Sequence, residues 1–161
     1  MIRRITRDGG RKLEQTYHNQ FEFLEFISIG EEALTQFYPL AGSYAVVKCD
    51  NKLLLCYNIW RKQWEIPAGK REANETAKEC AIRELFEETG QLVYDMEFKG
   101  LLKVKNKMND HLKYNPVYMV TVQTLQPFIP NNETSAILLW DVSKKIGSVD
   151  EVDLNVVNFL I

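Results

Sequence analysis

Cysteine and histidine are scarce in this chain of 161 residues, which has three cysteines and two histidines. The spacing of Cys49, Cys56 and Cys80 matches no paired zinc-ligand pattern. An odd and sparse set of cysteines also makes no disulfide framework, and such thiols are typical of a reducing compartment. We therefore expect reduced, partly buried cysteines in a cytoplasmic protein.

Long apolar runs and an excess of one charge are missing as well. No run approaches the roughly 18 residues of a membrane-spanning helix, and no apolar segment follows the basic start at residues 1–4. The formal net charge is −2, so bulk electrostatics give no reason to expect polyanion binding. We expect no membrane partner and no nucleic acid partner, and the sequence leaves a homodimer open.

Apolar residues make up 45% of the chain and charged residues 26%, which is typical of a globular protein. The length favours a single domain over residues 1–161, with residues 1–40 as an N-terminal extension of strands and loop. In that extension Asp8-Gly9 indicates a hairpin turn.

Alternating or continuous apolar segments predict strands. The predicted strands are residues 21–29, 44–49, 52–57, 98–105, 117–124 and 137–140, with Asp50-Asn51 as a hairpin turn and 106–115 as a polar loop. Apolar residues occupy both faces of the 44–57 hairpin, which indicates a sheet that is covered on both sides.

Two helices are predicted from the signals at their ends. Thr76 and Glu79 have the spacing of a capping box, and Gly90 suits the position just beyond a helix C-terminus. Ser148 and Glu151 form a second capping-box pattern, which precedes apolar residues at helical spacing. Strands that surround one helix and precede another predict an α/β sandwich with a mixed central sheet.

The first of these helices lies in an unusually acidic segment, residues 69–90, with the sequence GKREANETAKECAIRELFEETG. At 100° per residue, Glu84, Glu87 and Glu88 share an arc of about 100° on the helix. Like charges at this spacing repel one another, and oxygen ligands suit Mg²⁺ or Mn²⁺. The residues alone leave two interpretations open: a metal site that binds a phosphorylated substrate, and a solvated acidic helix face.

This segment resembles the Nudix box, G-x5-E-x7-R-E-U-x-E-E-x-G-U, in which U is an aliphatic residue. Gln91 stands where the last aliphatic residue is usual, which affects the packing at the end of the motif and not its chemistry. The matching positions are Gly69, Glu75, Arg83, Glu84, Leu85, Glu87, Glu88 and Gly90.

The resemblance implies a Nudix-type α/β/α sandwich with a loop-helix-loop motif, and a MutT-like pyrophosphohydrolase of no assigned subgroup. It implies Mg²⁺, or alternatively Mn²⁺, as the cofactor. The metal ligands that it implies are Glu84, Glu87, Glu88 and the carbonyl group of Ala68. The catalytic residues that it implies are Glu84, Arg83, Glu75 and Glu133.

The contact between Glu75 and Arg83 depends on where Glu75 lies, and the role of Glu133 has an alternative. If Glu75 and Arg83 were in one helix, about 12 Å would separate them, so their contact requires Glu75 to lie outside the helix and fold back. Glu133 is expected in a loop beyond the box, as an extra base or ligand, and a single loop glutamate can equally be solvated.

Substrate-binding candidates are Lys70 and Arg71, which could contact phosphates, and Trp64, which could stack on a base. The same residues could be a solubilising loop and a packed aromatic side chain. The resemblance implies that the substrate is a nucleoside diphosphate linked to another group: a nucleoside triphosphate, an oxidised nucleotide, or a nucleotide sugar such as ADP-ribose. A non-catalytic nucleotide sensor on the same fold is the alternative.

Overall fold

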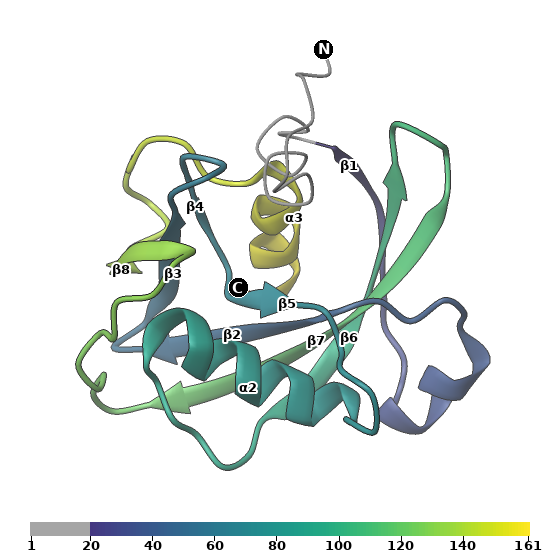
Figure 1. Ribbon diagram of the computed structural model, residues 1–161, viewed down its shortest axis with the longest axis horizontal. Coiled ribbons are helices and arrows are strands. Elements are labelled where there is room, and N and C mark those ends of the chain that lie inside the picture. The colour runs from purple at the N-terminus through teal and green to yellow at the C-terminus, as the bar shows by residue number, and fades with distance from the viewer. Residues whose placement is uncertain (1–19) are drawn as a thin grey trace.

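The computed structural model describes residues 20–161 and contains one large sheet with a helix on each side (Figure 1). The hairpin predicted at Asp8-Gly9 lies outside the described residues. The strands are β1 Phe21–Ile27, β2 Ser43–Cys49, β3 Lys52–Asn58, β4 Gln63–Glu65, β5 Ala68–Gly69, β6 Glu97–Asn106, β7 Leu112–Val122 and β8 Thr134–Trp140. The helices are the 3₁₀ helix η1 Glu31–Gln36, α2 Ala77–Thr89 and α3 Glu151–Leu160.

The sheet is mixed, as the sequence predicts. Its main path runs β1-β6-β7-β2-β3-β4, while β5 pairs with β2 and β8 pairs with β3. The pairing of β2 with β7 is parallel, and the other strand pairings are antiparallel. The β2–β3 turn has the expected register, with Cys49 opposite Lys52, and Asp50 and Asn51 both have positive φ. The segment before residue 40 joins this sheet, because β1 pairs along β6.

Each face of the sheet is covered by one helix, which makes the expected α/β sandwich (Figure 1). On one face, Ala81 and Leu85 of α2 pack with Val47 of β2. On the other face, Val156 of α3 packs with Val46 of β2. Alternate residues of a strand point to opposite faces, so one apolar strand supplies both cores.

The acidic helix α2 begins and ends where the sequence predicts. Thr76 accepts a hydrogen bond from the Glu79 amide, and the Glu79 side chain accepts one from the Thr76 amide, which completes the capping box. Gly90 adopts a left-handed conformation with φ of 82° and ends the helix.

Several predicted boundaries are wrong: β1 ends at Ile27 instead of residue 29, β8 begins at Thr134 instead of residue 137, and α3 and β7 also begin elsewhere. Helix α3 begins at Glu151 with Asp150 as its N-cap, because the Asp150 side chain accepts from the Asp153 amide and the Ser148 carbonyl oxygen is bonded to the Trp64 amide of β4. Strand β7 begins at Leu112, inside the predicted polar loop, because its backbone pairs with β6 and needs no apolar alternation to do so.

All three cysteines are free thiols and are buried. Across residues 20–161, the helices are too short or too polar to span a bilayer.

Candidate active site

Arg83 is the centre of the acidic segment. Its Nε and Nη2 atoms donate to the two carboxylate oxygens of Glu75, at 2.6 and 3.0 Å. Its Nη1 atom donates to Glu84 at 2.7 Å and to Glu87 at 3.1 Å. Nη2 also donates to the carbonyl oxygen of Lys70 at 2.8 Å, which ties the loop before the helix to α2. One guanidinium group therefore donates hydrogen bonds to three carboxylates, and a fourth carboxylate, that of Glu72, lies 3.7 Å from Nη1.

Glu75 lies before the cap residue Thr76, outside α2, and folds back onto Arg83 as the spacing requires. In the same loop, the backbone N–H of Glu72 donates to the Glu75 carboxylate at 2.9 Å. The bonds from Arg83 hold the pKa of Glu75 below its usual value. Charge-assisted hydrogen bonds thus tie Glu75, in the loop of the box, to Arg83 of α2.

Glu88 is the most deeply buried acid of the segment, with 4% of its surface exposed. One carboxylate oxygen accepts from the Ala68 amide at 3.1 Å and the other from the Cys56 thiol at 3.6 Å. Burial raises the pKa of Glu88 well above its usual value, and the negative charges of Glu133 and Glu84 raise it further. The carboxylate is fixed in place by these two donors, and the nearby charges that act on it most strongly are those of other acids.

Glu84 lies against the strand that enters the box. A β-carbon at Gly69 would overlap the Glu84 carboxyl group, so this position requires glycine for space. Burial raises the pKa of Glu84, while the bond from Arg83 lowers it. Glu87 is more open, with 54% of its side chain exposed. Glu84 and Glu88 thus lie against β5, at Gly69 and Ala68.

Glu133 comes from a different part of the chain, just before β8, yet its charge reaches Glu88. Its carboxylate is 3.9 Å from the guanidinium group of Arg61. The adjacent Thr134 donates its hydroxyl to the Glu88 carbonyl oxygen at 2.6 Å, which fastens this loop to the end of α2. The structure therefore brings Glu133 to the acidic segment.

Two neighbours of this site were missed in the sequence. Cys56 donates to Glu88, and the charge of Glu65 raises the Glu88 pKa. The two residues are opposite each other in the β3–β4 pairing. A buried acid within a short strand directly before the box is the signal that could have identified Glu65.

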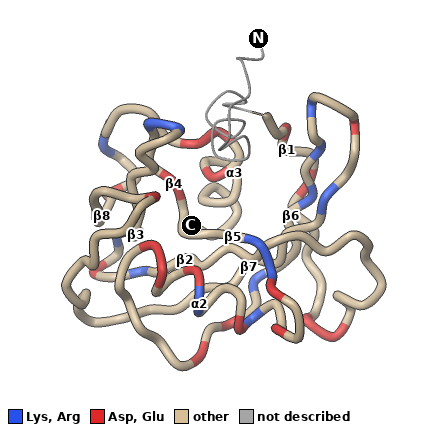
Figure 2. The backbone as a smooth tube through the Cα atoms, in the orientation of Figure 1, with Lys and Arg blue, Asp and Glu red and all other residues tan. Residues whose placement is uncertain are grey.

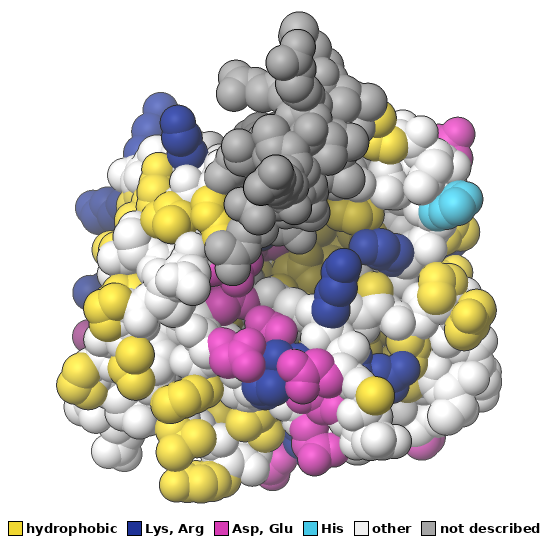
Figure 3. Space-filling view, in the orientation of Figure 1, with side chains coloured by type: hydrophobic (Ala, Val, Ile, Leu, Met, Phe, Trp, Pro, Cys, Tyr) yellow, Lys and Arg dark blue, Asp and Glu magenta, His cyan; other side chains and the backbone are white. Residues whose placement is uncertain are grey.

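A cavity of about 840 Å³ opens beside the box loop. Lys70 and Arg71 line it together with Ala68, and these two cations follow β5 directly (Figure 2). Asp150 and Asp153 line it on another side. In the space-filling view the hollow has a hydrophobic floor, with Lys and Arg side chains on one side and Asp and Glu on the other (Figure 3).

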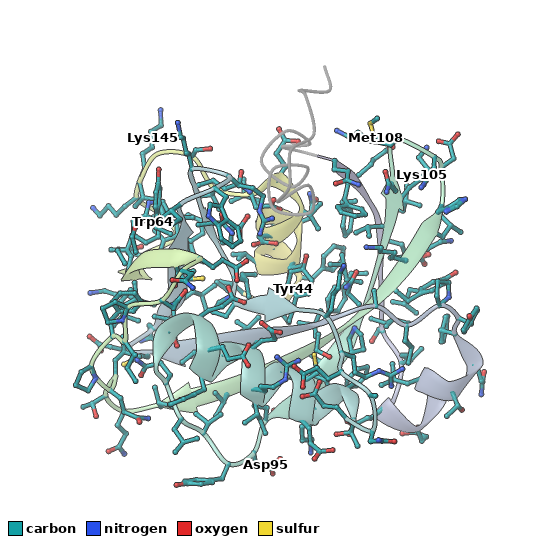
Figure 4. The ribbon with its side chains drawn as sticks, viewed as in Figure 1. Tyr44, Trp64, Asp95, Lys105, Met108 and Lys145 are labelled. Carbon is teal, nitrogen blue, oxygen red and sulfur yellow. The ribbon has the colours of Figure 1, made fainter. Side chains whose placement is uncertain are left out.

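Trp64 lies away from this cavity. Its ring packs edge-on against Tyr57 with ring centroids 5.2 Å apart, and it joins the core beneath α3. It is absent from the described lining of the cavity, whereas Tyr44 of β2 is part of that lining. Figure 4 shows Tyr44 near the centre of the molecule and Trp64 toward one side.

The acids of the segment fit a hard divalent cation in their donor chemistry, although they are not preassembled around one. Among residues 20–161, no group of three His, Cys, Asp or Glu side chains is already arranged to hold a metal ion. Instead, the Arg83 guanidinium group donates hydrogen bonds to Glu84 and Glu87. The donors are all oxygen atoms, which suit a cation such as Mg²⁺ or Mn²⁺. Burial, more than neighbouring charge, raises the pKa values of Glu84 and Glu88.

Comparison with known proteins gives the following matches. A family model described as the NUDIX domain matches residues 39–143. The uncharacterized Nudix hydrolase YvcI of Bacillus subtilis strain 168 is 36% identical over 67 residues, and this match spans 42% of either chain. The chain thus matches about two fifths of the length of that curated relative.

Several solved structures share the fold. A mutant of the pyrophosphohydrolase BsRppH of Bacillus subtilis has a TM-score of 0.66 at 21% identity, covering 84% of this chain and 86% of that one. A MutT NUDIX hydrolase from Burkholderia pseudomallei has a TM-score of 0.65 at 16% identity, covering 74% and 96%. The NUDIX domain of Shewanella oneidensis NrtR, solved with ADP ribose, has a TM-score of 0.61 at 16% identity, covering 82% and 97%.

Proposed function

Because the chain belongs to the NUDIX family, we propose that it is a metal-dependent pyrophosphohydrolase. Its substrate is a nucleoside diphosphate linked to another group: a nucleoside triphosphate, an oxidised nucleotide, or a nucleotide sugar such as ADP-ribose. Its cofactor is Mg²⁺, with Mn²⁺ as an alternative. The three free, buried cysteines support a cytoplasmic location.

The observation that supports this function best is the burial of Glu88 beside two other acids. Glu84 and Glu133 act on it from separate elements, and burial removes the screening that water would provide. A solvated acidic face would leave these carboxylates apart in water. Carboxylates that are held together out of water are typical of sites that bind a cation.

Glu84, Glu88 and the carbonyl group of Ala68 are the proposed ligands closest to the end of β5, and Glu87 is the exposed fourth. A bound divalent cation would neutralise diphosphate oxygens and lower the pKa of a water molecule. The Ala68 amide keeps the Glu88 carboxylate in position for this role. Arg83 and Glu75 act as positioning residues, because they fasten the loop of the box to α2.

Glu84 and Glu133 are the candidates for the general base that takes a proton from the attacking water. The raised pKa of Glu84 suits this role, since an effective base has a pKa closer to the working pH than an ordinary carboxylate does. Lys70 and Arg71 line the cavity directly after the box glycine and would contact the phosphate groups. The remaining volume of the cavity would then receive the nucleoside or the linked group.

The experiment is to incubate the protein with Mg²⁺ and a panel of nucleoside triphosphates, oxidised nucleotides and nucleotide sugars, and to measure released phosphate with and without added phosphatase. Activity on one class identifies the substrate. Glu88→Gln, purified in parallel, controls for a contaminating hydrolase. Tight binding of one nucleotide without turnover of any would contradict hydrolysis and favour the sensor.

A further inference from the structure

Gly42, which lies outside the Nudix box, touches the backbone of the box directly. Residues 42–44 run beside β5, with Ser43 opposite Gly69 in the pairing of β2 with β5. A β-carbon at Gly42 would overlap the carbonyl group of Gly69 and would lie 2.9 Å from the amide nitrogen of Lys70. The neighbouring atoms are backbone atoms, so no flexible side chain can move aside to make room.

The peptide group between Gly69 and Lys70 is also held by α2. Its carbonyl oxygen accepts from the Cys80 thiol at 3.3 Å, and the Glu84 carboxylate lies against the Gly69 α-carbon. The next carbonyl, that of Lys70, accepts from Arg83. The peptide is therefore clamped between the acidic helix and Gly42.

Gly42 is in turn fixed by β7. The side-chain Nδ2 of Asn115 donates to the Gly42 carbonyl oxygen at 2.6 Å. The preceding Ala41 amide donates to the Tyr114 carbonyl oxygen at 2.7 Å. On its other side Ser43, which is fully buried, donates its hydroxyl to the Ala77 carbonyl oxygen at 2.7 Å, at the start of α2. Segment 41–43 thus links β7 to the box.

We propose that Gly42 and Asn115 are positioning residues, which set the distance between the end of β5 and the carboxylates of α2. The inference rests on the proposed function, because the group that they position is the proposed ligand set of Ala68, Glu84 and Glu88. Asn115 holds the Gly42 carbonyl, and Gly42 permits the close approach of the Gly69–Lys70 peptide to Glu84. A shift of this peptide moves the Ala68 carbonyl away from the acids.

Gly42→Ala tests the close approach. The added methyl group must displace the Gly69 carbonyl, and a misplacement of about 1 Å costs on the order of 100-fold in rate. We expect kcat to fall by about that factor, with a smaller rise in KM because the displaced peptide carries Lys70, which lines the cavity. Gly30→Ala is the matched control, because the three atoms nearest to its β-carbon all belong to the end of the flexible Glu32 side chain.

Asn115→Ala tests the hydrogen bond from Asn115 to the Gly42 carbonyl oxygen and introduces no steric clash. Loss of one hydrogen bond that orients a ligand-bearing segment should lower kcat about tenfold. Asn155→Ala is the matched control, because the Asn155 side chain makes the same kind of bond to the Glu151 carbonyl oxygen on the exposed side of α3.

A second readout does not depend on turnover: the affinity of the substrate-free protein for Mn²⁺, measured from the electron paramagnetic resonance signal of free Mn²⁺. Changes behind a ligand set typically weaken metal binding at least tenfold, so we expect about that loss in Gly42→Ala. Circular dichroism and the melting temperature show whether each variant folds. If Gly42→Ala does not fold, Asn115→Ala decides.

Wild-type kcat and Mn²⁺ affinity in both folded variants would overturn the inference while leaving the proposed function intact. An increase in KM with unchanged kcat would also overturn it, because it would indicate direct substrate contact. If the wild-type protein hydrolyses no nucleotide, the proposed function fails, and Mn²⁺ affinity alone decides the inference. If the wild-type protein binds no Mn²⁺ either, both are overturned.

Discussion

The protein has two clusters of acidic residues, and their hydrogen-bond donors differ. The α3 cluster consists of Glu65, Asp150 and Asp153, with Arg61 as its cation. Glu65 accepts from Arg61 at 2.7 Å and from Gln63 at 2.6 Å. Asp153 accepts from the Ile66 amide at 2.7 Å, and Asp150 caps the helix on which Asp153 lies. In this cluster the acids accept hydrogen bonds from a backbone amide before β5, from a helix amide and from side chains.

The box cluster consists of Glu84, Glu87 and Glu88, with Arg83 as its cation. Here one guanidinium group donates hydrogen bonds to Glu84, to Glu87 and to the loop residue Glu75. The hydrogen bonds to the Glu88 carboxylate come from an amide and from a thiol, which is a weak donor. Burial raises the pKa of Asp153 in the α3 cluster as it raises that of Glu88 in the box cluster. The clusters differ in their donors, and the proposed function assigns cation binding to the box cluster alone.

The largest expected effect is on activity at the box cluster. Glu88→Gln should reduce hydrolysis about a thousandfold, since cation-dependent stabilisation of the transition state is worth several kcal/mol. The glutamine can still accept from the Ala68 amide, so the variant should fold. Steady-state kinetics and circular dichroism measure the two properties, with the exposed Glu25→Gln as control. Activity close to that of the wild type would refute the metal assignment of Glu88.

The corresponding change in the α3 cluster should act on stability. Asp153→Ala leaves the buried Ile66 amide without its acceptor, which costs about 2 kcal/mol of unfolding free energy. Asp153→Asn is the matched control, because its carbonyl oxygen can still accept this bond. Urea denaturation measures the difference. If both variants are equally stable, the Ile66 bond has no part in holding α3 to β4.

The next largest effect should be the stabilisation of the protein by added metal ion, which should depend on the box cluster and not on the α3 cluster. Mg²⁺ at ten times its dissociation constant should stabilise the wild-type protein by about 1.4 kcal/mol. Asp153→Asn should keep this increase and Glu88→Gln should lose most of it, as followed by the melting temperature at a fixed pH. An equal increase in both variants would place the cation elsewhere.

The smallest expected effect is a pH dependence that originates in the α3 cluster. Burial, with the charges of Asp150 and Glu65, raises the pKa of Asp153 well above its usual value. The folded protein therefore keeps a proton that the unfolded chain releases near pH 4, and stability falls as pH rises from there through the folded pKa.

Asp153→Asn has no such proton to lose. Its stability relative to the wild type should therefore increase between pH 4 and neutral pH, because only the wild type loses the stability that the bound proton provides. Urea denaturation of both proteins across this range measures the difference. Parallel stability curves would show that the Asp153 carboxyl group does not titrate with a raised pKa.

The parts of the fold that depend on local interactions were predictable. Thr76 and Gly90 set the ends of α2 through bonds to residues within four positions, and Asp50-Asn51 sets the β2–β3 turn in the same way. The choice between Ser148 and Asp150 as the cap of α3 was not local, because the Ser148 carbonyl is bonded to β4.

For the candidate site, the sequence alone determined which acids share a face of α2 and that Glu75 must fold back to reach Arg83, since helical geometry and spacing decide both. Only the tertiary structure decided which distant groups join them. Glu133 and Gly42 reach the box through strand pairings far apart in the chain, and Trp64 packs into the core instead of the cavity. Such approaches arise from long-range packing and strand register, which no local pattern of residues specifies.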